Sequence, residues 1–250
     1  MKRGVYILPN LITTGTMFGG VYAIIAVLKG HLEVACWAVI FAMFMDALDG
    51  KVARLTGATS SFGVQYDSLC DLVAFGVAPA LIAYAWALGR LGRVGWTLAF
   101  LYLTCGALRL ARFNVQAAHG PNTKSFTGLP IPAAAAVIST SYIFTHSVAS
   151  IPNQKGEALI VAILALRTAM LMVSNLPYAA FKEGLLNRRY PFIVLFCVIL
   201  GIVVVLSEPR VSLWVLAISY ALWGPVSWMW RVKRGKVSDS SPCEVEERQG

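Results

Sequence analysis

Four aspartates with close spacing are the residues of this sequence best suited to chemistry. Asp46 and Asp49 are three positions apart, and Asp67 and Asp71 are four apart, so each pair shares one face of a helix. The link at 55–61 (Leu-Thr-Gly-Ala-Thr-Ser-Ser) is short and turn-rich. We therefore expect the two helices to be antiparallel neighbours whose carboxylates face each other at similar depth.

Four unpaired carboxylates at such short range would repel one another strongly. One or two divalent cations would remove this repulsion, and ligands that are all oxygen favour Mg²⁺, Mn²⁺ or Ca²⁺ over zinc. Any one of these aspartates could instead be a helix cap or half of an ion pair. Two facing pairs are hard to explain in that way, so the pattern predicts a divalent metal site.

Small residues and one arginine accompany the aspartates. Gly50 follows Asp49, Ala53 lies one turn further on, and Gly63 lies one turn before Asp67. Small residues let helices approach and let a bulky ligand lie against the backbone. Arg54 is one turn from the carboxylates, where its guanidinium can bind an anion such as a phosphate.

The composition indicates which elements must position these residues. The chain has 250 residues, 58% of them hydrophobic and only 13% charged, whereas soluble domains are about half apolar and about a quarter charged. We predict an all-α membrane helix bundle of about eight spans, because an unpaired backbone cannot face lipid. The apolar runs place these spans at about 9–28, 32–54, 62–88, 94–113, 130–149, 157–175, 190–207 and 211–231.

The charge distribution predicts how the bundle is oriented. With eight spans both termini lie on one side, and 15 of the 21 Lys and Arg residues fall on that side against five on the other. The termini and the aspartates should therefore be cytoplasmic. The basic residues that give the net charge of +9 are scattered between apolar runs rather than gathered on one polar segment. This distribution argues against a nucleic-acid partner. We expect one membrane domain at 1–234 and a disordered acidic tail at 235–250.

The spacing of these residues resembles the signature of the CDP-alcohol phosphotransferases, membrane enzymes that transfer a substituted phosphate from a CDP-linked donor to an alcohol and release CMP. The matching positions read Asp46-x-x-Asp49-Gly50-x-x-Ala53-Arg54 and Gly63-x-x-x-Asp67-x-x-x-Asp71. Further segments are similar to one branch, the bacterial and archaeal phosphatidylserine synthases. These are Gly106–Asn114, Phe126–Pro132 and Met172–Asn175 followed by Phe181-Lys182. After Asn175 the chain reads Leu176-Pro177-Tyr178-Ala179, where that branch usually has a basic residue and a second proline.

The resemblance implies substrates, a cofactor and a role for each signature residue. The donor would be CDP-diacylglycerol, the acceptor L-serine, and the cofactor two divalent ions, Mg²⁺ or Mn²⁺ with Ca²⁺ possible. Family members are commonly homodimers in the membrane. The metal ligands would be Asp46, Asp49, Asp67 and Asp71, with Asp71 also the base, and the CMP and diphosphate would lie against Gly50, Ala53, Arg54 and Gly63.

Basic residues after the fourth span are candidates for binding the acceptor. Arg109 and Arg112 are one turn apart at the cytoplasmic end of that span, at the depth of the aspartates. Either guanidinium could bind the serine carboxylate or a phosphate. Both could equally serve only to anchor the span by the positive-inside rule. Asn114 and Lys124 are weaker candidates for the same site.

Two alternatives stay open. A family member could use another acceptor, such as glycerol phosphate, inositol phosphate or choline, and the basic segment does not exclude a phosphorylated one. A cation transporter would also place carboxylates within the membrane. That function explains the four acids, but it does not explain glycines, an alanine and an arginine at fixed spacing, and the acids lie near one face rather than at the midplane.

Overall fold

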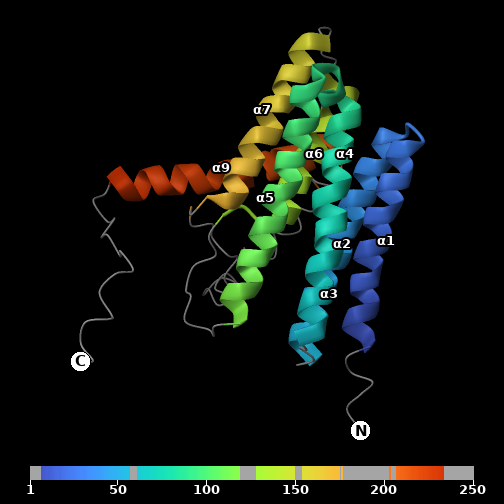
Figure 1. The fold of residues 1–250 in the computed structure, drawn as a ribbon, viewed down its shortest axis with the longest axis vertical. Helices are drawn as coiled ribbons and strands as arrows, with labels where there is room; N and C mark the ends of the chain where they lie inside the picture. The colour runs from blue at the N-terminus through green and yellow to red at the C-terminus, as the bar shows by residue number, and fades with distance from the viewer. Residues whose placement is uncertain are drawn as a thin grey trace.

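The computed structural model describes residues 7–56, 61–118, 128–149, 154–174, 176, 203 and 207–233, and this part of the chain is an assembly of helices joined by short turns (Figure 1). The first six of the eight predicted spans each coincide with a helical segment of the structure. The seventh, at 190–207, lies almost wholly outside the described residues, as does the predicted tail at 235–250. The helices are α1 (Ile7–Leu28), α2 (Leu32–Thr56), α3 (Ser61–Asp71), α4 (Ala78–Trp86), α5 (Arg93–Ala118), α6 (Ile131–Phe144), α7 (Gln154–Val173) and α9 (Pro209–Lys233).

Five helical segments of the described chain are long and apolar enough to cross a membrane. Helix α2 is not among them, since its C-terminal half carries the charged residues of the predicted site. The polytopic, all-helical architecture predicted from composition is therefore confirmed. The five segments are Asn10–Leu28, Phe62–Trp86, Arg93–Gln116, Ile131–Val148 and Gln154–Val173.

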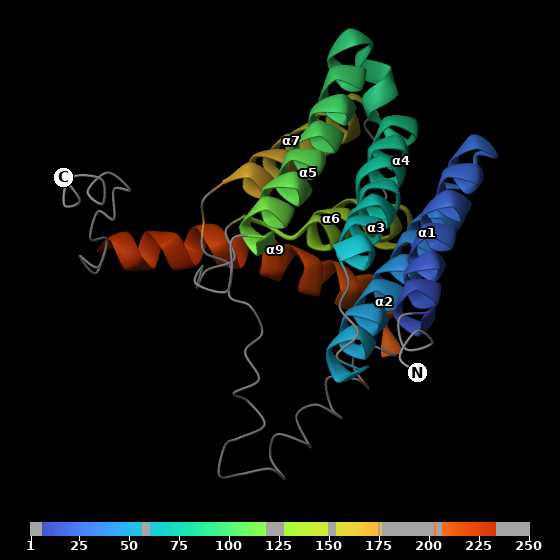
Figure 2. The same cartoon turned by 60° about the horizontal axis from the view of Figure 1, so that its bottom comes forward.

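Helix α9 forms over the predicted eighth span, but it runs across the other helices rather than along them (Figures 1 and 2). Its contact with α6 accounts for part of this placement. The Trp214 ring stacks on Phe144 with centroids 4.2 Å apart, and its Nε1–H donates to Ser141 Oγ at 3.1 Å. The helix was predicted as an eighth membrane span, but α9 is not among the described segments that are long and apolar enough to cross a membrane.

Helix α1 packs very closely against its neighbours, which brings it near the aspartates. It ends in a Schellman motif, in which Gly30 has φ +77° and the His31 N–H donates to Ala26 O at 2.9 Å. The chain then turns back into α2. Gly20 touches the segment Leu72–Val77 between α3 and α4, since a Cβ on Gly20 would lie 2.6 Å from Ala74 Cα. Only glycine fits this crossing.

The third predicted span is one continuous rod interrupted by a π-helical segment. Helix α3 runs into η1 (Leu72–Val77), whose turns are π-helical, and then into α4. The buried Tyr102 hydroxyl of α5 donates to Phe75 O at 3.1 Å, so it satisfies a carbonyl within this segment. Wide turns of this kind often occur at functional sites, and this one begins directly after Asp71.

The opposite end of the bundle is fastened by a buried carboxylate. Glu157 of α7 accepts a hydrogen bond from Trp86 Nε1 at 2.7 Å and pairs with Arg90 Nη1 at 2.7 Å. Arg90 lies in the 3-10 turn η2 (Leu88–Leu91). This network joins α4, η2 and α7 far from the aspartates, so we regard it as structural.

Candidate active site

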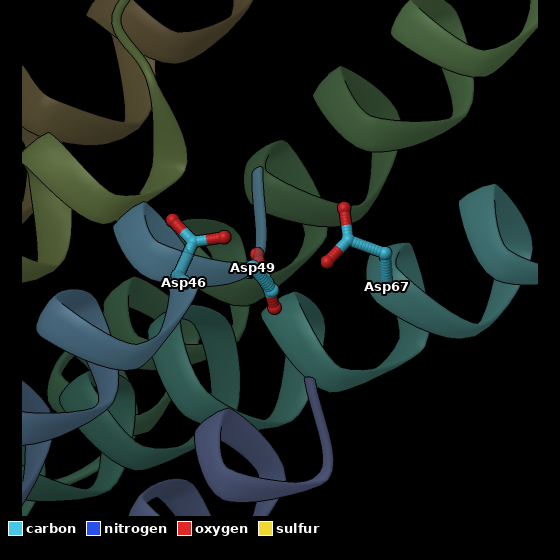
Figure 3. Close-up of side chains that lie close together, drawn as sticks. All are labelled: Asp46, Asp49 and Asp67. Carbon is cyan, nitrogen blue, oxygen red and sulfur yellow. The ribbon is translucent and has the colours of Figure 1, made fainter. Parts of the chain in front are cut away.

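The aspartate site lies where α2 and α3 run antiparallel, toward the end of the bundle that holds the start of α1 (Figure 1). Asp46 and Asp49 come from α2 and Asp67 comes from α3. One ligand oxygen from each carboxylate can be chosen so that all three lie within 4.8 Å of one another. Figure 3 shows Asp49 between the other two side chains. The structure therefore brings together three of the four aspartates that the spacing predicts to meet.

Asp71 lies beside this group rather than within it. It is the last residue of α3, its side chain is buried, and its carboxyl group is within hydrogen-bonding distance of Asp46. The Arg109 guanidinium of α5 is close enough to Asp71 for an electrostatic interaction. Asp71 thus lies at the edge of the site, next to the Arg109 guanidinium, a position distinct from that of the other three carboxylates.

The oxygens of this site fit a divalent cation. Asp49 Oδ2 and Asp71 Oδ1 are buried and have no hydrogen-bond partner, although buried carboxylate oxygens ordinarily have one. Among the described side chains, the two ion pairs involve Glu157 and Glu33 and none of these aspartates. Hard divalent ions prefer a donor set of carboxylate oxygens, and Asp46, Asp49 and Asp67 would hold such an ion.

The structure separates the two candidate arginines. Arg109 is half-buried, its buried Nε has no hydrogen-bond partner, and it approaches both Asp71 and Tyr220 of α9. Arg112, one turn further along α5, is exposed. A half-buried guanidinium with an unused N–H donor next to the carboxylates can bind an anionic group of a substrate. Arg109 is therefore the better candidate for contact with the acceptor.

Asn114 joins two helices instead of facing the aspartates. Its Nδ2 donates to Gln65 Oε1 at 3.2 Å and to Ser68 Oγ at 3.0 Å, so the end of α5 is tied to α3. This contact holds Arg109 and Asp71, one to two turns away along their own helices, in register. The sequence suggested a substrate contact for Asn114, whereas the structure gives it internal partners.

The structure describes some of the remaining predicted site residues but not others. Gly50 borders open space, since a Cβ there would meet nothing within 4 Å. Gly63 is half-buried on α3. The side chains of Ala53 and Arg54, and the whole of Lys124, lie outside the described residues.

Two residues at the site were missed by reasoning from the sequence. The Thr13 hydroxyl of α1 hydrogen-bonds to Asp49, and Tyr220 of α9 approaches Arg109. A sequence signal for Thr13 does exist, because it belongs to a group of polar residues in an otherwise apolar helix: Asn10, Thr13, Thr14 and Thr16. Tyr220 has no such signal.

Comparison with known proteins identifies the family. The model of the CDP-alcohol phosphatidyltransferase family matches residues 6–166. The chain is 37% identical to a CDP-diacylglycerol–serine O-phosphatidyltransferase of Helicobacter pylori, over 90% of this chain and 92% of that protein. It is 36% identical to an archaetidylserine synthase of Methanothermobacter thermautotrophicus, over 68% and 69% of the two chains. A Bacillus subtilis CDP-diacylglycerol–serine O-phosphatidyltransferase is 35% identical over 70% of this chain and 92% of its own. This chain belongs to the CDP-alcohol phosphatidyltransferase family.

Proposed function

We propose that this protein transfers the phosphatidyl group of CDP-diacylglycerol to the hydroxyl of L-serine, giving phosphatidylserine and CMP. The observation that carries the proposal is the meeting of three carboxylates within 4.8 Å on two antiparallel helices, in a chain of this family. Relatives named for this reaction align with most of the chain and support serine as the acceptor.

The donor diphosphate must be neutralised before an oxygen nucleophile can approach it. We propose that two divalent ions, Mg²⁺ or Mn²⁺ with Ca²⁺ possible, are held by Asp46, Asp49, Asp67 and Asp71. When bound, they neutralise the about two negative charges of the diphosphate and polarise its phosphorus. On the proposed assignment, the small residues Gly50, Ala53 and Gly63 leave room for the CMP moiety, and the Arg54 guanidinium contacts a phosphate.

Asp71 is the group we assign to move the proton. The serine hydroxyl gives its proton to the Asp71 carboxylate while its oxygen forms a bond to the phosphatidyl phosphorus. The bond from that phosphorus to the bridging oxygen breaks, and CMP leaves with the electron pair. Arg109 binds the serine carboxylate and thereby holds the hydroxyl near Asp71.

The chemistry is proposed to take place at the cytoplasmic face of the cytoplasmic membrane. Figure 1 places the start of α1, the end of α2, the start of α3 and the end of α5 at one end of the bundle, and the basic residues of these segments favour the cytoplasmic side. We propose a single membrane domain at 1–234, followed by a tail at 235–250 with no part in the reaction. A homodimer is proposed by analogy with the family.

An acceptor panel tests the assignment of serine. The purified protein is mixed with CDP-diacylglycerol, Mn²⁺ and one alcohol at a time: L-serine, glycerol phosphate, inositol phosphate or choline. We expect CMP release to depend on serine and to match phosphatidylserine formed. Turnover with another alcohol but not with serine would keep the family chemistry and refute the acceptor. A cation transporter would release no CMP with any alcohol.

Replacing Arg109 tests how the acceptor is held. Arg109→Gln removes a charge-assisted hydrogen bond of about 1.5–3 kcal/mol, so the KM for serine should rise about 10- to 150-fold, with a smaller change in kcat. Arg112→Gln, the same substitution one turn away on the exposed face, should raise this KM far less. A larger KM increase for Arg112→Gln than for Arg109→Gln would reverse the assignment.

A further inference from the structure

We propose that Thr13 of α1 is a positioning residue that orients the Asp49 carboxylate for metal binding, an inference that rests on the metal-dependent function proposed above. Thr13 is 5% exposed, and its hydroxyl hydrogen-bonds to the Asp49 side chain. Nothing in the aspartate signature includes this threonine, which lies more than 30 positions earlier in the chain.

The hydrogen bonds of Asp49 are arranged asymmetrically. Its carboxylate accepts from the Thr13 hydroxyl and from the Gly50 backbone N–H, whereas Oδ2 is buried without a partner. Figure 3 shows this carboxylate between those of Asp46 and Asp67. Held from the α1 side, Asp49 keeps one buried oxygen free of protein hydrogen bonds, and we assign this oxygen to the metal. Ligating carboxylates are usually fixed by such outer hydrogen bonds.

Helix α1 also contacts α3, the other helix that carries metal ligands, through Thr14. The Thr14 and Tyr66 hydroxyls are 3.0 Å apart, and Tyr66 directly precedes Asp67 on α3. Adjacent threonines of one helix therefore contact both helices that carry the metal ligands. The spacing of α2 and α3 at the site thus depends on α1.

Close packing explains why α1 can hold this position. A Cβ on Gly19 would lie 2.9 Å from the Ala42 Cβ, and Gly20 makes a similar approach to Ala74. With no side chains at these crossings, the backbone of α1 lies against α2 and η1, and a residue as short as threonine reaches Asp49. The hydroxyl is then presented at a fixed position rather than on a mobile side chain.

Metal binding by the full-length protein in detergent tests the proposal directly. Free Mn²⁺ is followed by electron paramagnetic resonance while it is titrated into wild type and variants, without substrate. Loss of an outer hydrogen bond to a ligand typically weakens metal affinity by about 10- to 100-fold, which we expect for Thr13→Val. Thr13→Ser keeps the hydroxyl and should bind Mn²⁺ nearly as wild type does.

A matched control removes a hydroxyl elsewhere in the bundle. Thr168 of α7 is also buried, and its Oγ1 donates to the Leu164 carbonyl of the same helix at 2.9 Å. Thr168→Val makes the same chemical change away from the aspartates, so its Mn²⁺ affinity should stay at the wild-type value. A loss in Thr13→Val that this control lacks belongs to the Thr13 position rather than to a weakened bundle.

The possible outcomes separate this inference from the function beneath it. Wild-type affinity in Thr13→Val, or an equal loss in Thr13→Ser, would overturn the positioning role. If Thr13→Val fails to fold, Thr13→Ala removes the hydroxyl without added bulk and decides the question by the same titration. A wild-type protein that binds no Mn²⁺ would refute the metal-dependent function itself.

Discussion

An Asp71→Asn protein is expected to fold and bind CDP-diacylglycerol but to lose transfer to serine. Asparagine has nearly the same shape as aspartate, yet its amide cannot accept a proton at neutral pH. A positioned general base contributes about 10²- to 10⁴-fold to the rate, and the loss should appear in kcat. The KM for the donor should change much less, because three other carboxylates remain at the site.

The surroundings of Asp71 explain why it is the aspartate assigned to this role. Its side chain is 9% exposed, Oδ1 has no hydrogen-bond partner, and Arg109 approaches it from α5. Asp46, Asp49 and Asp67 meet one another instead. The carboxylate beside the best candidate for acceptor binding is thus the one outside the group of three.

Single-turnover CMP release and equilibrium binding of donor, measured on the same preparations, test this prediction. Glu33→Gln is the matched control. It makes the same carboxyl-to-amide change in the first turn of α2, where Glu33 pairs with Arg210 at 3.3 Å on the surface. Near-normal turnover in Asp71→Asn would show that another group takes the proton. Loss of donor binding together with turnover would assign Asp71 to the metal site alone.

The helices and the meeting of the aspartates could be predicted because both depend on local periodicity. Spacings of three and four place side chains on one helix face whatever the rest of the chain does. A short link then makes the two helices antiparallel neighbours, which predicts that Asp46 and Asp49 lie near Asp67. In the structure both helices also pack on α1. The apolar runs similarly marked the first six helical segments, with errors of a few residues at their ends.

Features that depend on contacts between distant segments could not be predicted in this way. Asn114 bonded to Ser68, Thr13 reached Asp49, and Arg109 became half-buried while Arg112 stayed exposed. Each outcome depends on the rotation of one helix against another, which a single helix does not encode. The π-helical turns after Asp71 and the crossing of α9 have the same origin in tertiary packing.

Removal of divalent metal is expected to stop the reaction completely and reversibly. After treatment with a chelator and desalting, the protein should release no CMP with donor and serine present. Added Mg²⁺ or Mn²⁺ should restore the rate, whereas Zn²⁺, which prefers nitrogen and sulfur ligands, should not. Without an ion nothing would offset the repulsion between the diphosphate and the aspartates, so donor binding should fall along with turnover.

The thermal stability of the protein gives a second measurement that does not depend on activity, because a bound ion relieves the repulsion among those carboxylates. An ion that binds only the folded state stabilises it by about 2.7 kcal/mol at 100 times its dissociation constant, so Mn²⁺ should raise the Tm of the wild-type protein. Asp49→Asn removes one ligand and one charge, so this variant should gain less from the ion. Full turnover after chelation, with metal content checked by elemental analysis, would contradict the prediction. An equal rise in Tm for Asp49→Asn would instead place the ion away from these aspartates.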